Sequence, residues 1–315
     1  MIRNAIYFTL VLSLLLGGCA AKKNTAEQTQ STDEATQKAI AFQREGNFQE
    51  SLTWYAKALD KKETPELRNG AGAALLSSGS PDAALKEFER ALTFLPSSPD
   101  LYANKGTALS LLKKDDAALD AFNKALTYKP DHAEALNGKA LIELSRNNFE
   151  SAMVLMIKAR KSNPDNKMIV YNTAIAFESA GLLEDAETTF TDYLKKHPND
   201  AMALNGRGVA RLKLEKYALA NEDLSKAIKL SPTTGSYYYN RGLLWQKQLQ
   251  YKKAITDYTR SIAYSPDNST TYVNRGDTYF LLDEKEKGCS DLIKACNMGL
   301  CDKLESYKKI NLCTE

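Results

Sequence analysis

The sequence contains few of the residues that enzymes use for acid–base and metal chemistry. Its two histidines, His132 and His197, each lie beside a proline or aspartate turn, and no nearby motif orients them as bases. No Gly-rich nucleophile elbow, paired-carboxylate motif, phosphate-binding loop or metal-ligand spacing occurs. We therefore expect no enzymatic activity, no cofactor and no metal site.

The chain also lacks a large excess of either charge, with 42 basic and 39 acidic residues among 315. Binding to nucleic acid without sequence specificity depends on clustered Lys and Arg that neutralise phosphates. This near balance of charges argues against a nucleic-acid partner.

The apolar run at the amino terminus, from Ala5 to Leu16, is shorter than the roughly 20 residues that cross a bilayer. It follows Arg3 and ends in Leu16-Gly17-Gly18-Cys19, which resembles the signal peptide and lipobox of bacterial lipoproteins. The resemblance implies that residues 1–18 are removed and that Cys19 carries lipid on its thiol and on the new amino terminus. The alternative is an ordinary cleaved signal followed by a chance cysteine.

The residue after the cysteine is Ala20, not the Asp that commonly retains lipoproteins in the inner membrane. The resemblance therefore implies an outer-membrane anchor facing the periplasm, or a cell-membrane anchor if the source has no outer membrane. Residues 19–31 contain no large apolar residue after the lipidated cysteine, so we expect a flexible tether.

A strict 34-residue period occupies most of the remaining chain. Prolines recur at Pro96, Pro130, Pro164, Pro198, Pro232 and Pro266. Small residues recur with the same spacing at Ala84, Ala118, Ala152, Ala186, Ala220, Ala254 and Gly288. A second row of small residues contains Gly72, Gly106, Ala140, Ala174, Gly208, Gly242 and Gly276, and a row of large ones contains Phe88, Phe122, Met156, Phe190, Leu224, Tyr258 and Leu292. This pattern predicts a pair of closely packed helices in each period.

The small, bulky and proline positions resemble those of the tetratricopeptide repeat (TPR) family. The resemblance implies an all-α fold, an α-solenoid of about eight TPR helix hairpins spanning residues 32–300. The units begin near Thr32, Pro65, Pro99, Ala133, Lys167, Ala201, Gly235 and Ser269, and positions are counted below from these residues. Two local departures are Tyr193 at a position of alanine and Asp115 at a position of aromatic residues. Residues 301–315 are expected to form a capping helix and tail.

In this family the first helices of the repeats line a groove that binds peptides. Positions 5 and 6 here are rich in amides and tyrosines, which suit an extended or helical polypeptide. The predicted peptide-binding residues are Asn104, Asn137, Tyr171, Asn172, Asn205, Tyr239, Asn240 and Asn274, beside apolar Leu141, Ile175, Val209 and Leu243. An equally weighted alternative is that the asparagines bond between neighbouring repeats and fix their stacking. Positions 2 and 5 carry no lysine, which disfavours the carboxylate clamp of chaperone-binding members.

The last three units share an arginine at position 7 and an aspartate at position 23. We predict ion pairs within each hairpin between Arg207 and Asp223, Arg241 and Asp257, and Arg275 and Asp291. A site for a bound anion is the alternative use of these arginines.

Four cysteines, Cys289, Cys296, Cys301 and Cys313, lie near the C-terminus, and disulfides are expected in an exported protein. Cys289 and Cys296 are about 10 Å apart along one predicted helix, too far to bond to each other. If a tail helix folds back, the nested pairs Cys296–Cys301 and Cys289–Cys313 match its register. Crossed pairs, free thiols and a metal site remain open.

These observations predict a lipid-anchored scaffold that binds protein or peptide partners in the periplasm and assembles an envelope complex. By resemblance, that complex serves pilus or secretin assembly, peptidoglycan enzymes or protease regulation. A glycan-binding envelope receptor is the alternative, with Tyr171, Tyr237, Tyr238 and Tyr239 as stacking platforms.

Overall fold

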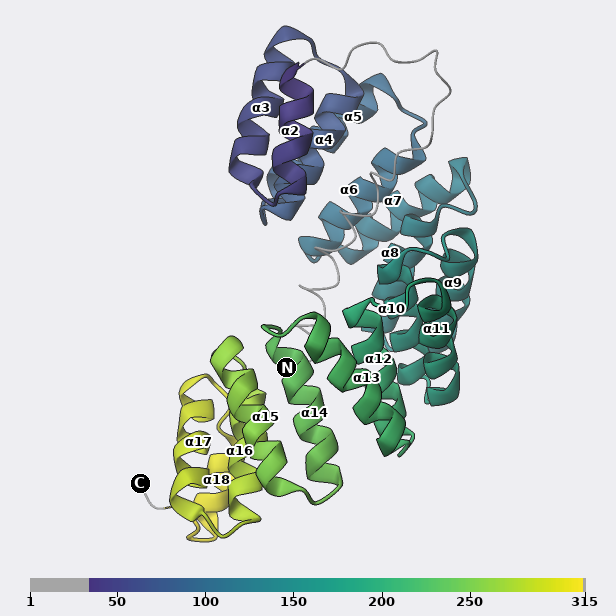
Figure 1. Ribbon diagram of the computed structural model, residues 1–315. Helices are drawn as coiled ribbons and strands as arrows, with labels where there is room; N and C mark the ends of the chain where they lie inside the picture. Colours follow the sequence, from purple (N-terminus) through teal and green to yellow (C-terminus); the bar gives the residue numbers. More distant parts are fainter. Residues whose placement is uncertain (1–33, 314–315) are drawn as a thin grey trace. The chain divides into compact units, whose positions relative to one another are not determined.

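The computed structural model describes residues 34–313. The predicted signal peptide, the lipid site at Cys19 and the tether lie outside the described residues. Within them the chain forms seventeen helices and no strand (Figure 1). The expected all-α fold is confirmed.

The chain divides into two units, Met1–Ala180 and Gly181–Glu315, and each is described by itself. The first contains α2 (Glu34–Arg44), α3 (Phe48–Lys61), α4 (Pro65–Ser77), α5 (Pro81–Phe94), α6 (Pro99–Leu111), α7 (Asp115–Tyr128), α8 (Ala133–Ser145), α9 (Phe149–Ser162) and α10 (Lys167–Ser179). The second contains α11 (Leu183–Lys196), α12 (Ala201–Lys213), α13 (Tyr217–Leu230), α14 (Gly235–Lys247), α15 (Tyr251–Tyr264), α16 (Ser269–Phe280), α17 (Lys285–Asn297) and α18 (Asp302–Lys309).

Each predicted repeat supplies a first helix and a second helix. Within the units the pairs α2/α3, α4/α5, α6/α7, α8/α9, α12/α13, α14/α15 and α16/α17 pack as hairpins. The fifth repeat supplies α10 and α11, which fall in different units. Each second helix also packs on the first helix of the next repeat within its unit, as α3 does on α4 and α13 on α14. This stacking is that of an α-solenoid, as the 34-residue period predicts.

Polar residues immediately before the first helices fix where most of them begin. The side chains of Thr64, Ser98, His132, Asn166, Asp200 and Asn268 each accept a hydrogen bond from a backbone N–H in the first turn. Such caps satisfy donors that a helix leaves unpaired at its start.

The turn inside each hairpin needs one residue with a left-handed backbone. Position 15 has a positive φ in all eight repeats: Gly46, Gly79, Lys113, Asn147, Gly181, Glu215, Leu249 and Asp283. Glycine adopts this conformation without steric cost, whereas the φ of 59° at Leu249 is unfavourable for a branched apolar residue.

The small and large rows pack against each other inside the hairpins. A Cβ atom added to Gly72 would lie 2.5 Å from the Phe88 ring, and one added to Gly106 would lie 2.6 Å from Phe122. Phe88, Phe122 and their counterpart Tyr258 are fully buried. The prediction that the small rows permit close helix packing is therefore confirmed.

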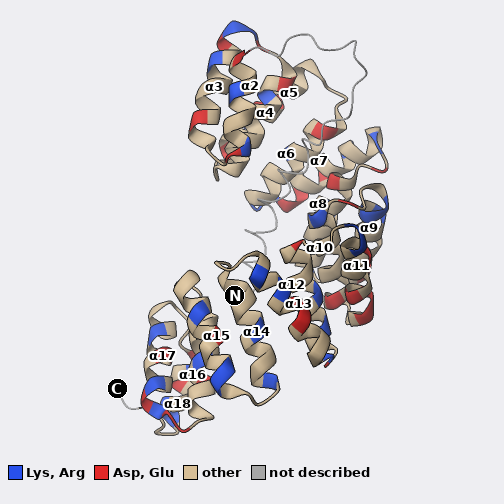
Figure 2. Ribbon diagram, in the orientation of Figure 1, with Lys and Arg blue, Asp and Glu red and all other residues tan. Residues whose placement is uncertain are grey.

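The departure at Tyr193 is absorbed locally. Its ring is buried beside His197, with 4.5 Å between the ring centroids, and its hydroxyl donates to Asp200 at 3.3 Å. Basic and acidic side chains are interspersed over the helices of both units (Figure 2). No helix between residues 34 and 313 is long and apolar enough to span a bilayer.

Candidate interaction site

The asparagines at positions 5 and 6 of the first helices form hydrogen bonds between neighbouring repeats. Four bonds are of this kind: Asn104 to Asn69 at 2.8 Å, Asn172 to Asn137 at 2.9 Å, Asn240 to Asn205 at 2.8 Å and Asn274 to the hydroxyl of Tyr239 at 2.9 Å. In each, the position-6 amide donates to position 5 of the preceding repeat. These side chains therefore bond between neighbouring repeats, as the second of the two predictions for the asparagines states.

The peptide-binding prediction is wrong for three of the eight residues. Asn137 and Asn172 have no exposed surface, and Asn205 is only 7% exposed. A peptide cannot reach side chains that neighbouring helices cover. Asn104, Tyr171, Tyr239, Asn240 and Asn274 are partly exposed, and for them peptide contact stays a prediction.

Position 6 alternates between asparagine and glycine through much of the chain. Gly70, Gly138 and Gly206 each follow an acceptor asparagine at position 5, and an added Cβ would meet Tyr55, Phe122 or Phe190 of the preceding repeat within 2.6 Å. The hydrogen-bonded asparagine pairs therefore recur every two repeats. At the junctions between them, position 6 is glycine, and an aromatic ring of the preceding repeat packs against it where the other junctions have an amide pair.

A second set of inter-repeat contacts lies on the opposite side of the first helices. The residue at position 7 reaches position 25 of the preceding second helix at five junctions: Lys105 to Glu89 at 2.8 Å, Lys139 to Asn123 at 2.9 Å, Arg207 to Thr191 at 3.4 Å, Arg241 to Ser225 at 3.1 Å and Arg275 to Thr259 at 3.0 Å. We call these contacts the position-7 bridges. Each joins a first helix to the second helix of the preceding repeat.

The three arginines among these bridges also make the predicted ion pairs within their hairpins. Arg207, Arg241 and Arg275 each donate two hydrogen bonds to their aspartate, one to each carboxylate oxygen, at 2.7–2.9 Å. The prediction is confirmed. Because the guanidinium groups are already paired with carboxylates, the alternative of an anion site is not supported.

Residues at position 11 extend two of these ion pairs differently. Arg211 donates to Asp223 at 2.8 Å and to Glu187 at 2.8 Å, whereas Trp245 donates its indole N–H to Asp257 at 3.0 Å. Burial raises the pKa of Glu187, but hydrogen bonds from Lys216 and Arg211 outweigh it, so the net pKa is lowered. The second helices of this unit are thereby fixed by charged networks.

The glycan alternative is wrong for two of its four tyrosines. Tyr237 and Tyr238 are 9% and 5% exposed, so neither offers a ring face to a sugar. Tyr238 instead stacks on Tyr264 and donates its hydroxyl to the carbonyl of Pro232 at 3.0 Å. Burial raises the pKa of the partly exposed Tyr171 and Tyr239.

His132 is held more firmly than the sequence analysis expects. The ring is 3% exposed, its Nδ1 accepts from the backbone N–H of Ala135 at 3.2 Å, and its Nε2 lies 2.8 Å from Asp100 Oδ1. The expectation that no group orients this histidine is therefore wrong. Nε2 is engaged within the third repeat and Nδ1 caps the first helix of the fourth, which leaves neither ring nitrogen available as a base.

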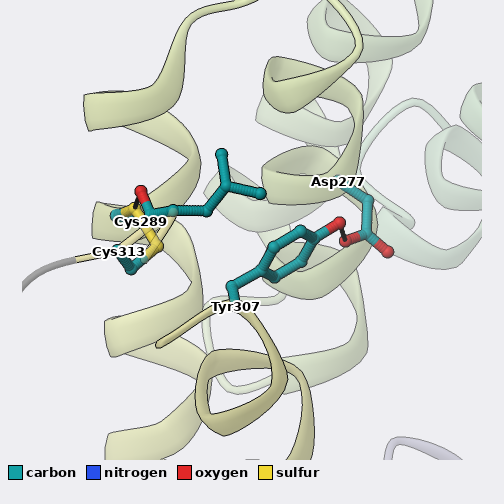
Figure 3. Close-up of a disulfide and its surroundings, with 5 residues drawn as sticks. Asp277, Cys289, Tyr307 and Cys313 are labelled. Atoms are coloured by element: carbon teal, nitrogen blue, oxygen red, sulfur yellow. Dashed lines mark hydrogen bonds between the residues drawn. A yellow bond between two sulfur atoms is a disulfide. The ribbon is translucent and has the colours of Figure 1, made fainter. Parts of the chain in front are cut away.

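The C-terminal helix α18 occupies the place of a ninth first helix. Asp302 begins it 33 residues after the start of α16, and buried Leu304 corresponds to the buried Thr271 of α16. The Tyr307 ring stacks on Phe280, with 4.5 Å between the ring centroids. Its hydroxyl donates to Asp277 at 3.0 Å (Figure 3). The helix therefore covers the end of the stack.

Two disulfides hold this helix at its start and just beyond its end. Cys296 pairs with Cys301. Cys289 of α17 pairs with Cys313 (Figure 3). This is the nested pairing. Among the described residues, no group of three or more His, Cys, Asp or Glu side chains could hold a metal ion.

Profiles of the tetratricopeptide repeat family match residues 36–99, 114–166, 155–201, 171–234 and 235–268. The chain belongs to this family. TPR proteins generally act as scaffolds for protein interactions, and the stacked hairpins described above are the structural basis of that role. No curated protein matches the chain.

Three solved structures illustrate the similarity of the TPR fold. A tetratricopeptide repeat protein from Parabacteroides merdae is 21% identical with a TM-score of 0.57, over 78% of this chain and 97% of its own. The Cut9–Hcn1 hetero-tetramer of APC/C is 16% identical in sequence with a TM-score of 0.65, over 85% of this chain and 53% of its own. PilF of Pseudomonas aeruginosa is 16% identical in sequence with a TM-score of 0.55, over 64% of this chain and 92% of its own.

Proposed function

We propose that this TPR protein is a lipid-anchored adaptor that binds protein partners on the periplasmic side of an outer membrane. Its Cys19 would carry the anchor, and its repeats would assemble partners into an envelope complex. No reaction and no nucleic-acid partner are part of the proposal. The observation that supports it best is the stack of TPR hairpins following a lipobox-like segment.

The first-helix face of α12 and α14 is the part of the scaffold best suited to peptide contact. Val209, Leu212 and Leu243 are partly exposed there at positions 9 and 12. They are accompanied by partly exposed Gln246 and by exposed Lys213 and Lys247. Apolar side chains bordered by donors can hold an extended or helical segment through both anchors and hydrogen bonds.

Co-purification from detergent-solubilised envelope tests the proposed binding face. The double variant Val209→Glu/Leu243→Glu places charge on it, and Val154→Glu/Ile157→Glu is a matched control on α9, where those residues are 46% and 47% exposed. We expect the first variant alone to lose partners that wild type retains. Equal retention by both variants would reject this face as the binding surface.

The lipid anchor is tested separately with Cys19→Ser. We expect the wild-type amino terminus to carry acyl chains in mass spectrometry and the protein to sediment with membranes, and the variant to lose both properties. An unmodified wild-type amino terminus beginning elsewhere would reject the anchor while leaving the adaptor role intact.

A further inference from the structure

The position-7 bridges are interrupted at the junction between the first two repeats. Position 7 of α4 is Ala71, and the opposing residue of α3 is Ala56, which corresponds to Glu89 in the next repeat. Two methyl groups therefore stand where the next junction has the Lys105–Glu89 ion pair. At the fifth repeat Thr173 also replaces the basic residue, but its hydroxyl bonds the carbonyl of Met156 at 3.4 Å.

At this junction an open crevice with a volume of about 420 Å³ lies between α3, α4 and α5. Leu52, Ala56 and Leu59 line it from α3, and Ala71 and Leu75 line it from α4. The three α3 residues lie on one helical face and extend about 10 Å along the axis. Tyr55, Asp60, Arg68 and Glu87 complete the lining, so the crevice is a slot of mixed apolar and polar character with a size typical of ligand sites.

The charged groups around this crevice leave one carboxylate unbalanced. Arg68 donates to Glu63 at 3.1 Å and to Glu87 at 2.8 Å, while Arg90 donates to Glu63 at 2.8 Å. These two arginines and two glutamates form a network with no net charge. Asp60, which also lines the crevice, is exposed and has no hydrogen bond or ion pair within residues 34–313.

The corresponding crevice in the second unit has a different character. It lies between α11, α12 and α13, has a volume of about 310 Å³ and is lined by Lys195, Arg207 and Lys226. Arg207 crosses it to Thr191 and ion-pairs with Asp223. Glu222 and Asp223 also line it, so its lining contains three basic and two acidic residues, whereas the charged residues of the first crevice are Arg68, Asp60 and Glu87. Of these two crevices, the first therefore has a lining with an excess of negative charge.

We propose that this crevice is a docking site for an amphipathic segment of a partner protein. Apolar side chains of leucine or phenylalanine size would lie against Leu52, Leu59 and Leu75, and a lysine or arginine of the segment would pair with Asp60. Charge complementarity selects a basic segment over an acidic one. The chain's own residues 20–31 do not suit the slot, because they include no large apolar side chain.

This site is separate from the first-helix face and does not depend on it. A partner held there would leave the first-helix face of α12 and α14 free for a second segment or a second protein. Two sites on one scaffold allow the binding of one segment to raise the effective concentration of the other.

The decisive variant is Ala56→Glu/Ala71→Lys, which introduces the bridging pair that Glu89 and Lys105 already form one repeat later. It fills part of the crevice with a contact that this fold already uses. Asp60→Lys is a second variant at an exposed site, so it tests the charge without altering the packed helices. The control Glu89→Ala/Lys105→Ala removes the bridge at the next junction.

The probe is a display library of helical peptides selected on the full chain in detergent, without depletion on any variant. We expect the enriched peptides to carry apolar residues three and four apart with a neighbouring Lys or Arg. A synthetic peptide of the enriched sequence should bind at least tenfold more weakly to the bridged variant and to Asp60→Lys. The control and Val209→Glu/Leu243→Glu should bind it like wild type.

Three results would overturn the proposal. Peptides that bind the bridged variant as tightly as wild type would place their site elsewhere. Binding that survives Asp60→Lys unchanged would remove the requirement for a basic partner. Self-association of the full chain that the bridged variant abolishes would assign the crevice to a second copy. Retained binding by Val209→Glu/Leu243→Glu distinguishes each result from failure of the first-helix site.

Discussion

Asn172 donates a hydrogen bond to Asn137 at 2.9 Å, and neither side chain has any exposed surface. The two residues are 35 positions apart and lie on the first helices of successive repeats. Asn137 Nδ2 and Asn172 Oδ1 have no hydrogen-bond partner within the described part of the chain. The pair therefore joins two repeats while leaving one buried polar atom on each partner unsatisfied.

This arrangement predicts opposite outcomes for single and double substitution. Asn172→Leu alone should lower the free energy of unfolding by about 1–3 kcal/mol, because Asn137 would lose its only partner. Asn137→Leu/Asn172→Leu should restore most of that loss, since no buried amide then remains. Urea denaturation followed by circular dichroism measures both. A double variant less stable than the single one would contradict the interpretation.

The buried aspartates of the last repeats should be sensitive to truncation. Asp257 accepts two hydrogen bonds from Arg241 and one from Trp245 and is 3% exposed. We expect Asp257→Ala to cost about 3 kcal/mol in thermal or urea unfolding, because it leaves a guanidinium without its carboxylate. Asp116→Ala is the comparison. Its side chain is 94% exposed and pairs with Arg146, so the expected loss is below about 1 kcal/mol.

Leu249 offers a stabilising substitution. It has a φ of 59° and is 70% exposed, so it combines an unfavourable backbone conformation with exposed apolar surface. Leu249→Gly should raise the free energy of unfolding by about 1 kcal/mol. Asn147→Gly, at the same turn position of the fourth repeat, should change it less, since asparagine tolerates this conformation. A lower melting temperature for Leu249→Gly would contradict this reasoning.

The two disulfides should contribute unequally to the stability of the C-terminal cap. Cys289–Cys313 spans 24 residues and Cys296–Cys301 spans 5. Loop-closure entropy predicts losses of about 3 and 2 kcal/mol when each pair is changed to serine. Hydrogen exchange of α18 in the two double-serine variants measures the effect, and non-reducing peptide mapping checks the pairing. Crossed linkages would contradict the nested arrangement.

The cap should also loosen in strong alkali. Burial, together with the hydrogen bond to Asp277 and the charge of that residue, raises the pKa of Tyr307 to about 12. An unfolded tyrosine has a pKa of about 10. The folded state therefore holds this proton more tightly, so its contribution to stability is complete below the unfolded pKa and disappears as the pH rises towards 12. Faster hydrogen exchange of α18 over that interval is expected in wild type, and Tyr307→Phe should remove this dependence.

Much of the fold could be predicted from the sequence, because the same small, large and proline residues recur at equivalent positions in successive repeats. The proline and small-residue rows identify eight hairpins, and the paired arginine and aspartate rows identify their ion pairs. The turn at position 15 was missed. In some repeats this position holds glycine, and in others it holds, for example, leucine, glutamate or lysine, as at Leu249, Glu215 and Lys113. No single residue type therefore identifies the turn in the sequence.

The candidate site was less predictable, because exposure depends on how helices stack. The same amides suit a peptide or a neighbouring helix, and burial of Asn137 and Asn172 decides between these uses. From the sequence, His132 is a loop residue that no group orients, because Asp100 lies 32 positions away and approaches it only in the folded stack.

The sequence by itself determined the period, the helix pairs and the positions where side chains must be small. These properties follow from the spacing of residues along the chain and from side-chain volume, and the same pattern recurs in every repeat. Tertiary structure alone decided which polar side chains are covered and where a bridge is missing. Both depend on contacts between residues some 16 to 35 positions apart, such as Lys105 with Glu89 and Asn172 with Asn137. The missing bridge at Ala56 and Ala71 is such a feature, because these two residues oppose each other only once α3 and α4 pack together.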